Sequence, residues 1–157
     1  MFSKRPPRYS PKHDKLDKPH DLGCMLHIDV AFHYLRKKIR QFPELEQRKV
    51  TTADTFFPAK SGPSWFDVNT VLMPIHLGDL KHWALVKLEL TNWTIEVYDS
   101  LQHEGPHNSK VRAGVEGNYQ IPVTIMKDIP QQANGGNCGM FTIKNAECLI
   151  EGKDVCY

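Results

Sequence analysis

The feature that most restricts the fold of this sequence is a pair of neighbouring strand-like runs, HWALVKLEL at 82–90 and WTIEVYDS at 93–100. In each run, residues that point to one face alternate with residues that point to the other, as in a β-strand. Only the dipeptide Thr91-Asn92 separates the two runs, and a connection that short predicts a hairpin. We therefore expect an antiparallel pair of strands at the centre of the domain.

Helical patterns lie on both sides of these strands. Apolar residues recur at helical spacing before them and predict a helix over 27–42, which ends at Pro43; they are Ile28, Phe32, Leu35, Ile39 and Phe42. Basic residues are expected on the other faces of that helix, namely Arg36, Lys37, Lys38 and Arg40. A second helix is predicted from Cys138 onward, with a buried stripe of Met140, Ile143, Ala146 and Ile150.

Two further strand-like runs, 68–77 and 121–126, complete the expected elements, while 44–66 has no clean period. A helix, then strands, then a helix predict an α+β domain. The first 20 residues combine four prolines with basic side chains and cannot bury an apolar core, so we expect a disordered tail over 1–20 and one domain over 21–157.

The cysteines and the absence of long apolar runs bear on the compartment. The four cysteines show neither a CxxC pair nor zinc-ligand spacing, and the chain has neither an apolar leader nor an apolar run of membrane-spanning length. We expect a reducing compartment, the nucleus or the cytoplasm, with KRPPR at 4–8 as a weak nuclear signal. A net charge of +2 does not indicate nucleic-acid binding, and we expect a monomer.

The segment IPQQANGGNCGMFT at 129–142 carries the clearest chemical signal. Two glycines precede Cys138, which opens the predicted helix, and a helix N-terminus favours a thiolate over a thiol. Gly139 has no side chain and is expected to leave the approach to the sulfur open. Cys148 and Cys156 are interpreted as core residues.

A nucleophilic thiol needs a base that a third group orients. The predicted hairpin brings the start of one strand, His82, beside the end of the next, Asp99. The backbone N–H of Cys138 and the side-chain amide of Gln132 are candidate donors to an oxyanion. His103 and His107 lack carboxylates at ligand spacing, so we expect no metal, and the chemistry requires no cofactor.

These segments resemble the ubiquitin-like-protein-specific (SUMO) proteases, a family of papain-like cysteine proteases. The likeness rests on PIHLGDLKHWALVKLEL, VYDS and IPQQANGGNCGMF, in that order, and covers most of 21–152. The first helix, HIDVAFHYLRKK, is similar to that of plant-type members. The resemblance implies a central, mostly antiparallel sheet flanked by helices.

The resemblance also implies a function and roles for residues. The enzyme would cleave after the C-terminal Gly-Gly of a modifier such as SUMO, in precursor processing or deconjugation. Cys138 would be the nucleophile, His82 the base, Asp99 its orienting group, and Gln132, rather than Gln131, the oxyanion donor. The expected partners are the modifier and its conjugates, with no nucleic acid and no membrane.

Two residues bear on substrate binding in such an enzyme. Trp83 corresponds to the residue that roofs a narrow glycine channel. In the family, the second wall of that channel is usually a Trp before the first helix, where this chain has Cys24 in a segment that we expect to be shortened. The end of the chain at Tyr157, soon after the predicted Cys138 helix, likewise predicts a shortened domain. An alternative is therefore an impaired relative that acts as a modifier-binding module. Acetyl transfer on the same triad is a third hypothesis, which Trp83 disfavours.

Overall fold

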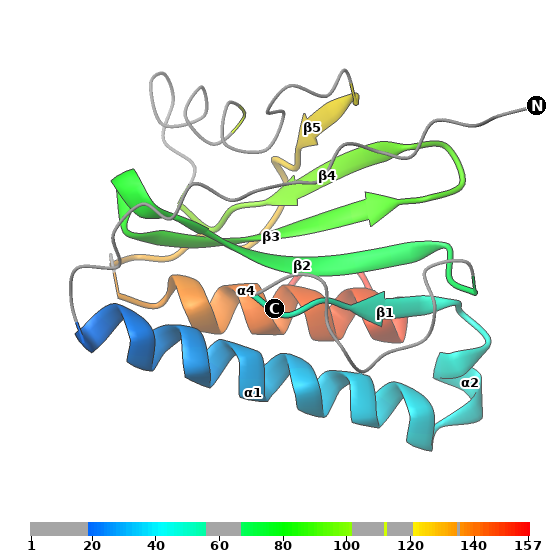
Figure 1. Cartoon of the computed structure of the whole chain (residues 1–157). Helices are drawn as coiled ribbons and strands as arrows, with labels where there is room; N and C mark the ends of the chain where they lie inside the picture. The colour runs from blue at the N-terminus through cyan, green and yellow to red at the C-terminus, as the bar shows by residue number, and fades with distance from the viewer. Residues whose placement is uncertain (1–18, 56–66, 102–111, 113–120, 135) are drawn as a thin grey trace, which may run out of the picture.

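A five-stranded mixed sheet forms the centre of the computed structural model, which describes residues 19–55, 67–101, 112, 121–134 and 136–157 (Figure 1). The elements in chain order are α1 (Pro19–Gln41), α2 (Pro43–Glu46), β1 (Val50–Thr52), β2 (Thr70–Leu77), η1 (Gly78–Leu80), β3 (His82–Glu89), β4 (Thr94–Tyr98), β5 (Val123–Ile125) and α4 (Cys138–Glu151). The strands lie in the order β1-β2-β3-β4-β5. This arrangement confirms the expected α+β class.

The longest pairings in the sheet are antiparallel. In β2 and β3, Thr70 lies opposite Glu89 and Leu77 opposite His82, while the shorter edge strands β1 and β5 pair in parallel with β2 and β4. The β3–β4 hairpin closes at Glu89 and Thr94, so its loop is longer than the predicted dipeptide. Trp93 in this loop has a φ of 54°, and this left-handed conformation turns the chain into β4.

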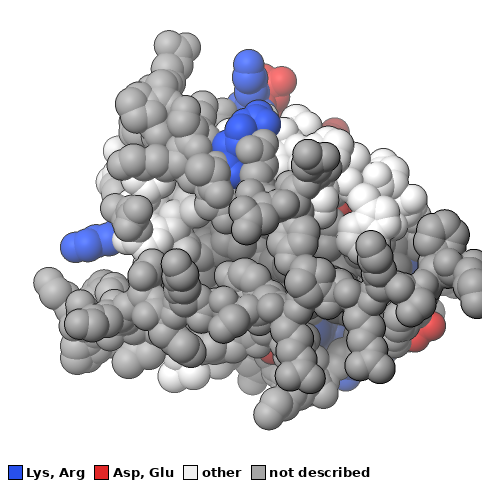
Figure 2. All heavy atoms as spheres, turned by 45° about the horizontal axis from the view of Figure 1, so that its top comes forward, with Lys and Arg blue, Asp and Glu red and all other residues white. Residues whose placement is uncertain are grey.

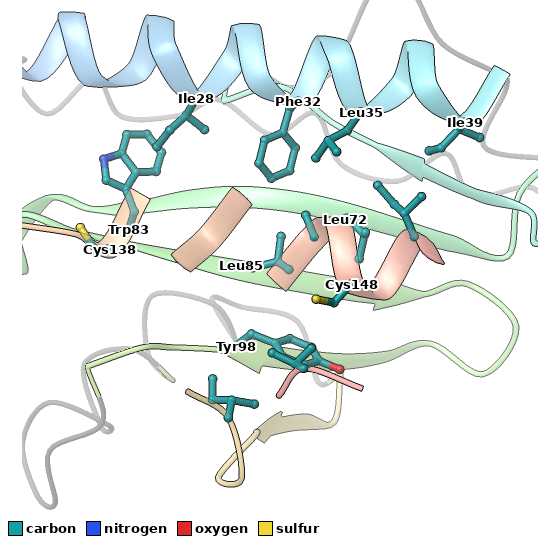
Figure 3. Packing of buried hydrophobic residues seen from close by; sticks show 14 residues of the cluster. Ile28, Phe32, Leu35, Ile39, Leu72, Trp83, Leu85, Tyr98, Cys138 and Cys148 are labelled. Carbon is teal, nitrogen blue, oxygen red and sulfur yellow. The ribbon is translucent and has the colours of Figure 1, made fainter. Parts of the chain in front are cut away.

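One face of the sheet is covered by α4, with α1 packed beside it (Figure 1). The core between the sheet and these two helices is apolar and nearly solvent-free (Figure 3). Its side chains include Phe32, Leu35, Leu72, Leu85 and Ile150. The opposite face buries a second cluster that includes Val71, Ala84, Val86 and Val97. Because both faces of β3 are buried, the sheet holds His82 rigidly at its end.

The helices differ from the sequence expectation in two ways. Helix α1 begins at Pro19, eight residues before the predicted start at 27. Arg36, expected on a solvated face, is only 5% exposed, because its guanidinium donates to the Thr52 carbonyl and hydroxyl and pairs with Asp54. A buried cation with such partners ties α1 to β1, which the sequence pattern missed.

Helix α4 (Cys138–Glu151) also packs differently from its apolar pattern. Met140 is 67% exposed, whereas Thr142 and Asn145 are buried. The predicted stripe was therefore wrong at Met140, because the buried face follows Cys138 and not the most apolar residues. Gly152 ends the helix with a φ of +69°, a left-handed cap that glycine adopts without strain.

The distribution of surface charge and the apolar character of the helices bear on the expected lack of nucleic-acid and membrane partners. In the view of Figure 2, Lys and Arg side chains and Asp and Glu side chains of the described residues occur singly or in small groups. No helix among the described residues is both long enough and apolar enough to cross a bilayer.

Candidate active site

Cys138 occupies the first turn of α4, at the point where the chain leaves its glycine-rich segment. The residue before it, Asn137, has φ −102° and ψ 4°, and its carbonyl accepts hydrogen bonds from the N–H groups of Met140 and Phe141. The thiol is only 6% exposed. The first N–H groups of a helix have no partner inside the helix and carry partial positive charge, which stabilises an anion at this position.

His82 and Asp99 come from adjacent strands and meet at the end of the β3–β4 hairpin. The imidazole Nε2 lies 2.7 Å from Asp99 Oδ1, and the two side chains are 2% and 0% exposed. The backbone N–H of Leu101 donates to the same carboxylate oxygen at 2.9 Å. The carboxylate is thus fixed from two sides and in turn fixes the plane of the imidazole.

The imidazole of His82 also bonds to the thiol of Cys138, and the contact shifts both pKa values. Burial favours the neutral imidazole, but the hydrogen bonds and charges of Asp99 and Cys138 raise the His82 pKa to about 9. Burial likewise opposes ionisation of the thiol. The bond from His82 and the backbone N–H groups of Trp83 and Gly139 nevertheless hold the Cys138 pKa below its ordinary value. The arrangement favours a thiolate–imidazolium pair.

The two neighbouring glutamines differ in what their amides contact. Gln131 donates its side-chain N–H₂ to the Ile129 carbonyl at 3.1 Å and the Asp99 carbonyl at 3.4 Å. Gln132 is 8% exposed and accepts the Ser100 hydroxyl on Oε1 at 3.0 Å, while its buried Nε2 has no partner among the described residues. Of these two glutamines, Gln132 is therefore the one whose buried N–H₂ can bind an oxyanion.

Trp83 and Gly139 both lie next to Cys138, because the backbone of each bonds to its thiol. Trp83 is 5% exposed, and its ring centroid lies 4.8 Å from that of His76 on β2, with Ile28 and Cys138 in the same cluster (Figure 3). A Cβ at position 139 would lie 3.3 Å from Cδ1 of Ile28. The missing side chain of Gly139 thus permits close packing of α4 on α1.

Other candidate residues lie away from this cluster or outside the described structure. Cys148 is 8% exposed in the core, as expected, but Cys156 is exposed, so its interpretation as a core residue was wrong. His103 and His107 lie outside the described residues, and Cys24 lies on α1. Ser100, which contacts Gln132, was not among the predicted site residues, and its position directly after Asp99 was the one sequence signal near the site.

A buried thiol at a helix N-terminus, beside a His that a carboxylate orients, is the arrangement expected of a cysteine protease. A profile of the Ulp1 protease family, C-terminal catalytic domain, matches residues 31–155. The chain belongs to this family.

Curated relatives agree with this assignment. Sentrin-specific protease 2 of Rattus norvegicus is 32% identical over 110 residues, which is 61% of this chain and 18% of that protein. Human sentrin-specific protease 5 is 33% identical over 100 residues, 54% of this chain and 12% of that protein. The ubiquitin-like-specific protease ESD4 of Arabidopsis thaliana is 27% identical over 62% of this chain and 22% of that protein. The chain thus matches less than a quarter of the length of these relatives.

Solved structures show the same fold. The yeast Ulp1 protease domain in complex with Smt3, the yeast ortholog of SUMO, aligns with a TM-score of 0.53 and 20% identity, over 87% of this chain and 72% of that one. A Ulp1 structure whose catalytic cysteine is oxidised to a sulfonic acid aligns with a TM-score of 0.54 and 21% identity, over 81% and 67% of the two chains.

Proposed function

We propose that residues 21–157 form a cysteine peptidase that cleaves after the C-terminal Gly-Gly of a ubiquitin-like modifier such as SUMO. The observation that carries the proposal is the contact of His82 with both Asp99 and Cys138 in a domain of the Ulp1 family. The complex of the yeast Ulp1 domain with Smt3 supports the choice of modifier. The substrates would be modifier precursors, modifier conjugates, or both.

The proposed reaction uses each group of the site in turn. The Cys138 thiolate attacks the carbonyl carbon of the last glycine, and the resulting oxyanion is held by the Cys138 N–H and the Gln132 amide. As the C–N bond breaks, the His82 imidazolium gives its proton to the leaving amine and the thioester remains on sulfur. His82 then takes a proton from water, which hydrolyses the thioester and frees the thiolate.

The orientation of His82 fits this sequence of proton transfers. Its Nε2 is bonded to Asp99, so Nδ1 is the nitrogen that remains for the Cys138 thiol and for the leaving group. Asp99 is fully buried, so the charge that stabilises the imidazolium is not screened by water. In this account Asp99 holds the ring and its charge state and does not itself move a proton.

The alternative, a modifier-binding module without turnover, is motivated by the N-terminal segment. Cys24 stands on α1 where the family resemblance places a channel-forming Trp, and Trp83 would then be the one Trp wall of the glycine channel.

The plant-type affiliation also stays a prediction, because ESD4 at 27% identity matches no better than the animal relatives. For the compartment we propose the nucleus or the cytoplasm, which the free thiols Cys138, Cys148 and Cys156 support.

Hydrolysis of a SUMO whose terminal glycine is amide-linked to a fluorophore tests the proposal. We expect turnover that is abolished in Cys138→Ala and nearly absent when ubiquitin replaces SUMO. Saturable binding of SUMO without turnover, in protein whose Cys138 still reacts with iodoacetamide, would instead establish the binding module.

A further inference from the structure

Ser100 lies directly after Asp99 and contacts Gln132 in two ways. The backbone N–H of Gln132 donates to the Ser100 carbonyl at 2.8 Å, and the Ser100 hydroxyl donates to Gln132 Oε1 at 3.0 Å. Ser100 is only 2% exposed, so water does not compete for either bond. Both the backbone and the side-chain amide of Gln132 are therefore held by one residue.

The side-chain bond fixes which end of the Gln132 amide is free. Because the carbonyl oxygen faces the Ser100 hydroxyl, the N–H₂ group is on the opposite side of the amide, where Nε2 is buried without a partner among the described residues. Buried donors are normally bonded, and an unbonded one is costly unless a ligand completes it. Even the N–H₂ of Gln131, an exposed residue, is bonded to backbone carbonyls.

We propose that Ser100 is a positioning residue that presents the N–H₂ of Gln132 to the oxyanion. This proposal rests on the proposed function, in which Gln132 is the oxyanion donor. Without the hydroxyl, nothing described in the structure prevents the amide from reversing and turning its carbonyl oxygen toward the negative charge. A reversed amide would repel the oxyanion, so the loss of Ser100 affects the transition state and not the thiolate.

The position of Ser100 in the chain couples two parts of the site. Asp99 holds His82 through its carboxylate, and the next residue holds Gln132 through its hydroxyl and carbonyl. One short segment after β4 thus sets both the base and the oxyanion donor.

Two reactions of Cys138 separate a positioning role from a general loss of structure. Acylation by p-nitrophenyl acetate forms an S–C bond, breaks the ester C–O bond and releases p-nitrophenolate through a tetrahedral oxyanion. Alkylation by iodoacetamide displaces iodide and forms no oxyanion. Neither reagent needs a modifier, so both reactions test Ser100 even if the proposed modifier is wrong.

The experiment compares Ser100→Ala, Gln132→Ala and the double variant. We expect Gln132→Ala to slow acylation by roughly 100-fold or more, Ser100→Ala to slow it by roughly 10-fold, and the double variant to equal Gln132→Ala. Alkylation should stay at the wild-type rate in all three, and Ser100→Thr, which keeps the hydroxyl, should restore acylation.

Thr70→Val is the matched control. Thr70 is buried, and its hydroxyl donates to Glu89 at the far end of β2 and β3 from His82, so this variant loses a buried hydroxyl without touching Gln132. It should leave both reactions unchanged. Effects of Ser100→Ala and Gln132→Ala that multiply in the double variant, or equal slowing of alkylation and acylation, would overturn the proposal. SUMO cleavage by the wild type, measured in parallel, decides the proposed function separately.

Discussion

Replacing Asp99 by Asn should uncouple the thiolate–imidazolium pair while leaving the fold intact. The His82 pKa stands at about 9 against an ordinary value of 6.5, a difference that corresponds to roughly 3 kcal/mol in favour of the imidazolium. Burial lowers the His82 pKa, so Asp99 and Cys138 together stabilise the imidazolium by more than this net difference. Without the Asp99 charge, the His82 pKa should fall below neutrality.

The pH dependence of Cys138 alkylation measures this change. In the wild type the reactive pair forms as the pH rises through the lowered Cys138 pKa, and the imidazolium is lost as the pH rises through about 9. Turnover should therefore be bell-shaped. In Asp99→Asn the thiol has no cation beside it, so its inflection should move up toward 9, and alkylation at pH 6.5 should fall by roughly 100-fold.

Asn at position 99 still has an oxygen that can accept the Leu101 N–H, now bonded at 2.9 Å, so the loop conformation should be kept. Asp128→Asn, which removes the same charge from an exposed position, is the control and should behave as the wild type. An alkylation profile of Asp99→Asn that superimposes on the wild type would refute the electrostatic account of the pair.

Three further predictions concern the scaffold that carries the site. Gly139→Ala should destabilise the domain by about 1 kcal/mol through its contact with Ile28 Cδ1, and Ile28→Val, which removes that atom, should cancel the loss in a denaturation double-mutant cycle. The Lys38–Glu151 pair joins α1 to α4, and the hydrogen bonds from Lys153 and, second, from Lys38 lower the Glu151 pKa to about 2. The contribution of the Lys38–Glu151 pair to the stability of the fold is therefore present above the ordinary Glu pKa of 4.5 and is lost as the pH falls through about 2. The Lys38→Met substitution should lower the free energy of unfolding by under about 1 kcal/mol, and by less in high salt. Phe32→Ala, at a fully buried position, should cost roughly 3–5 kcal/mol in chemical denaturation, and a much smaller loss would contradict the packing of α1.

The hairpin and the helices were predictable from local pattern, because their apolar residues repeat over many positions. Strand β1 was not, since three residues carry no period and this strand depends on its pairing with β2 and on Arg36, which bonds Thr52. The burial of Arg36 follows from those tertiary partners and not from the charge pattern of the helix.

The proximity of Cys138, His82 and Asp99 was easier to predict than the contacts that support these residues. Cys138, His82 and Asp99 follow from a glycine-rich turn before a helix and from the geometry of one hairpin. The contact between Ser100 and Gln132 joins residues 32 positions apart and depends on how two irregular segments pass each other, which no periodicity records. The exposure of Met140 likewise follows from the way α4 rotates to bury Cys138.

The most direct test of the central claim is the reaction of the purified chain with a SUMO whose C-terminal glycine carries an electrophile, followed by intact mass. We predict one covalent adduct, located on Cys138 and absent from Cys138→Ala. Folded protein that binds SUMO yet forms no adduct, although iodoacetamide still alkylates Cys138, would contradict the account.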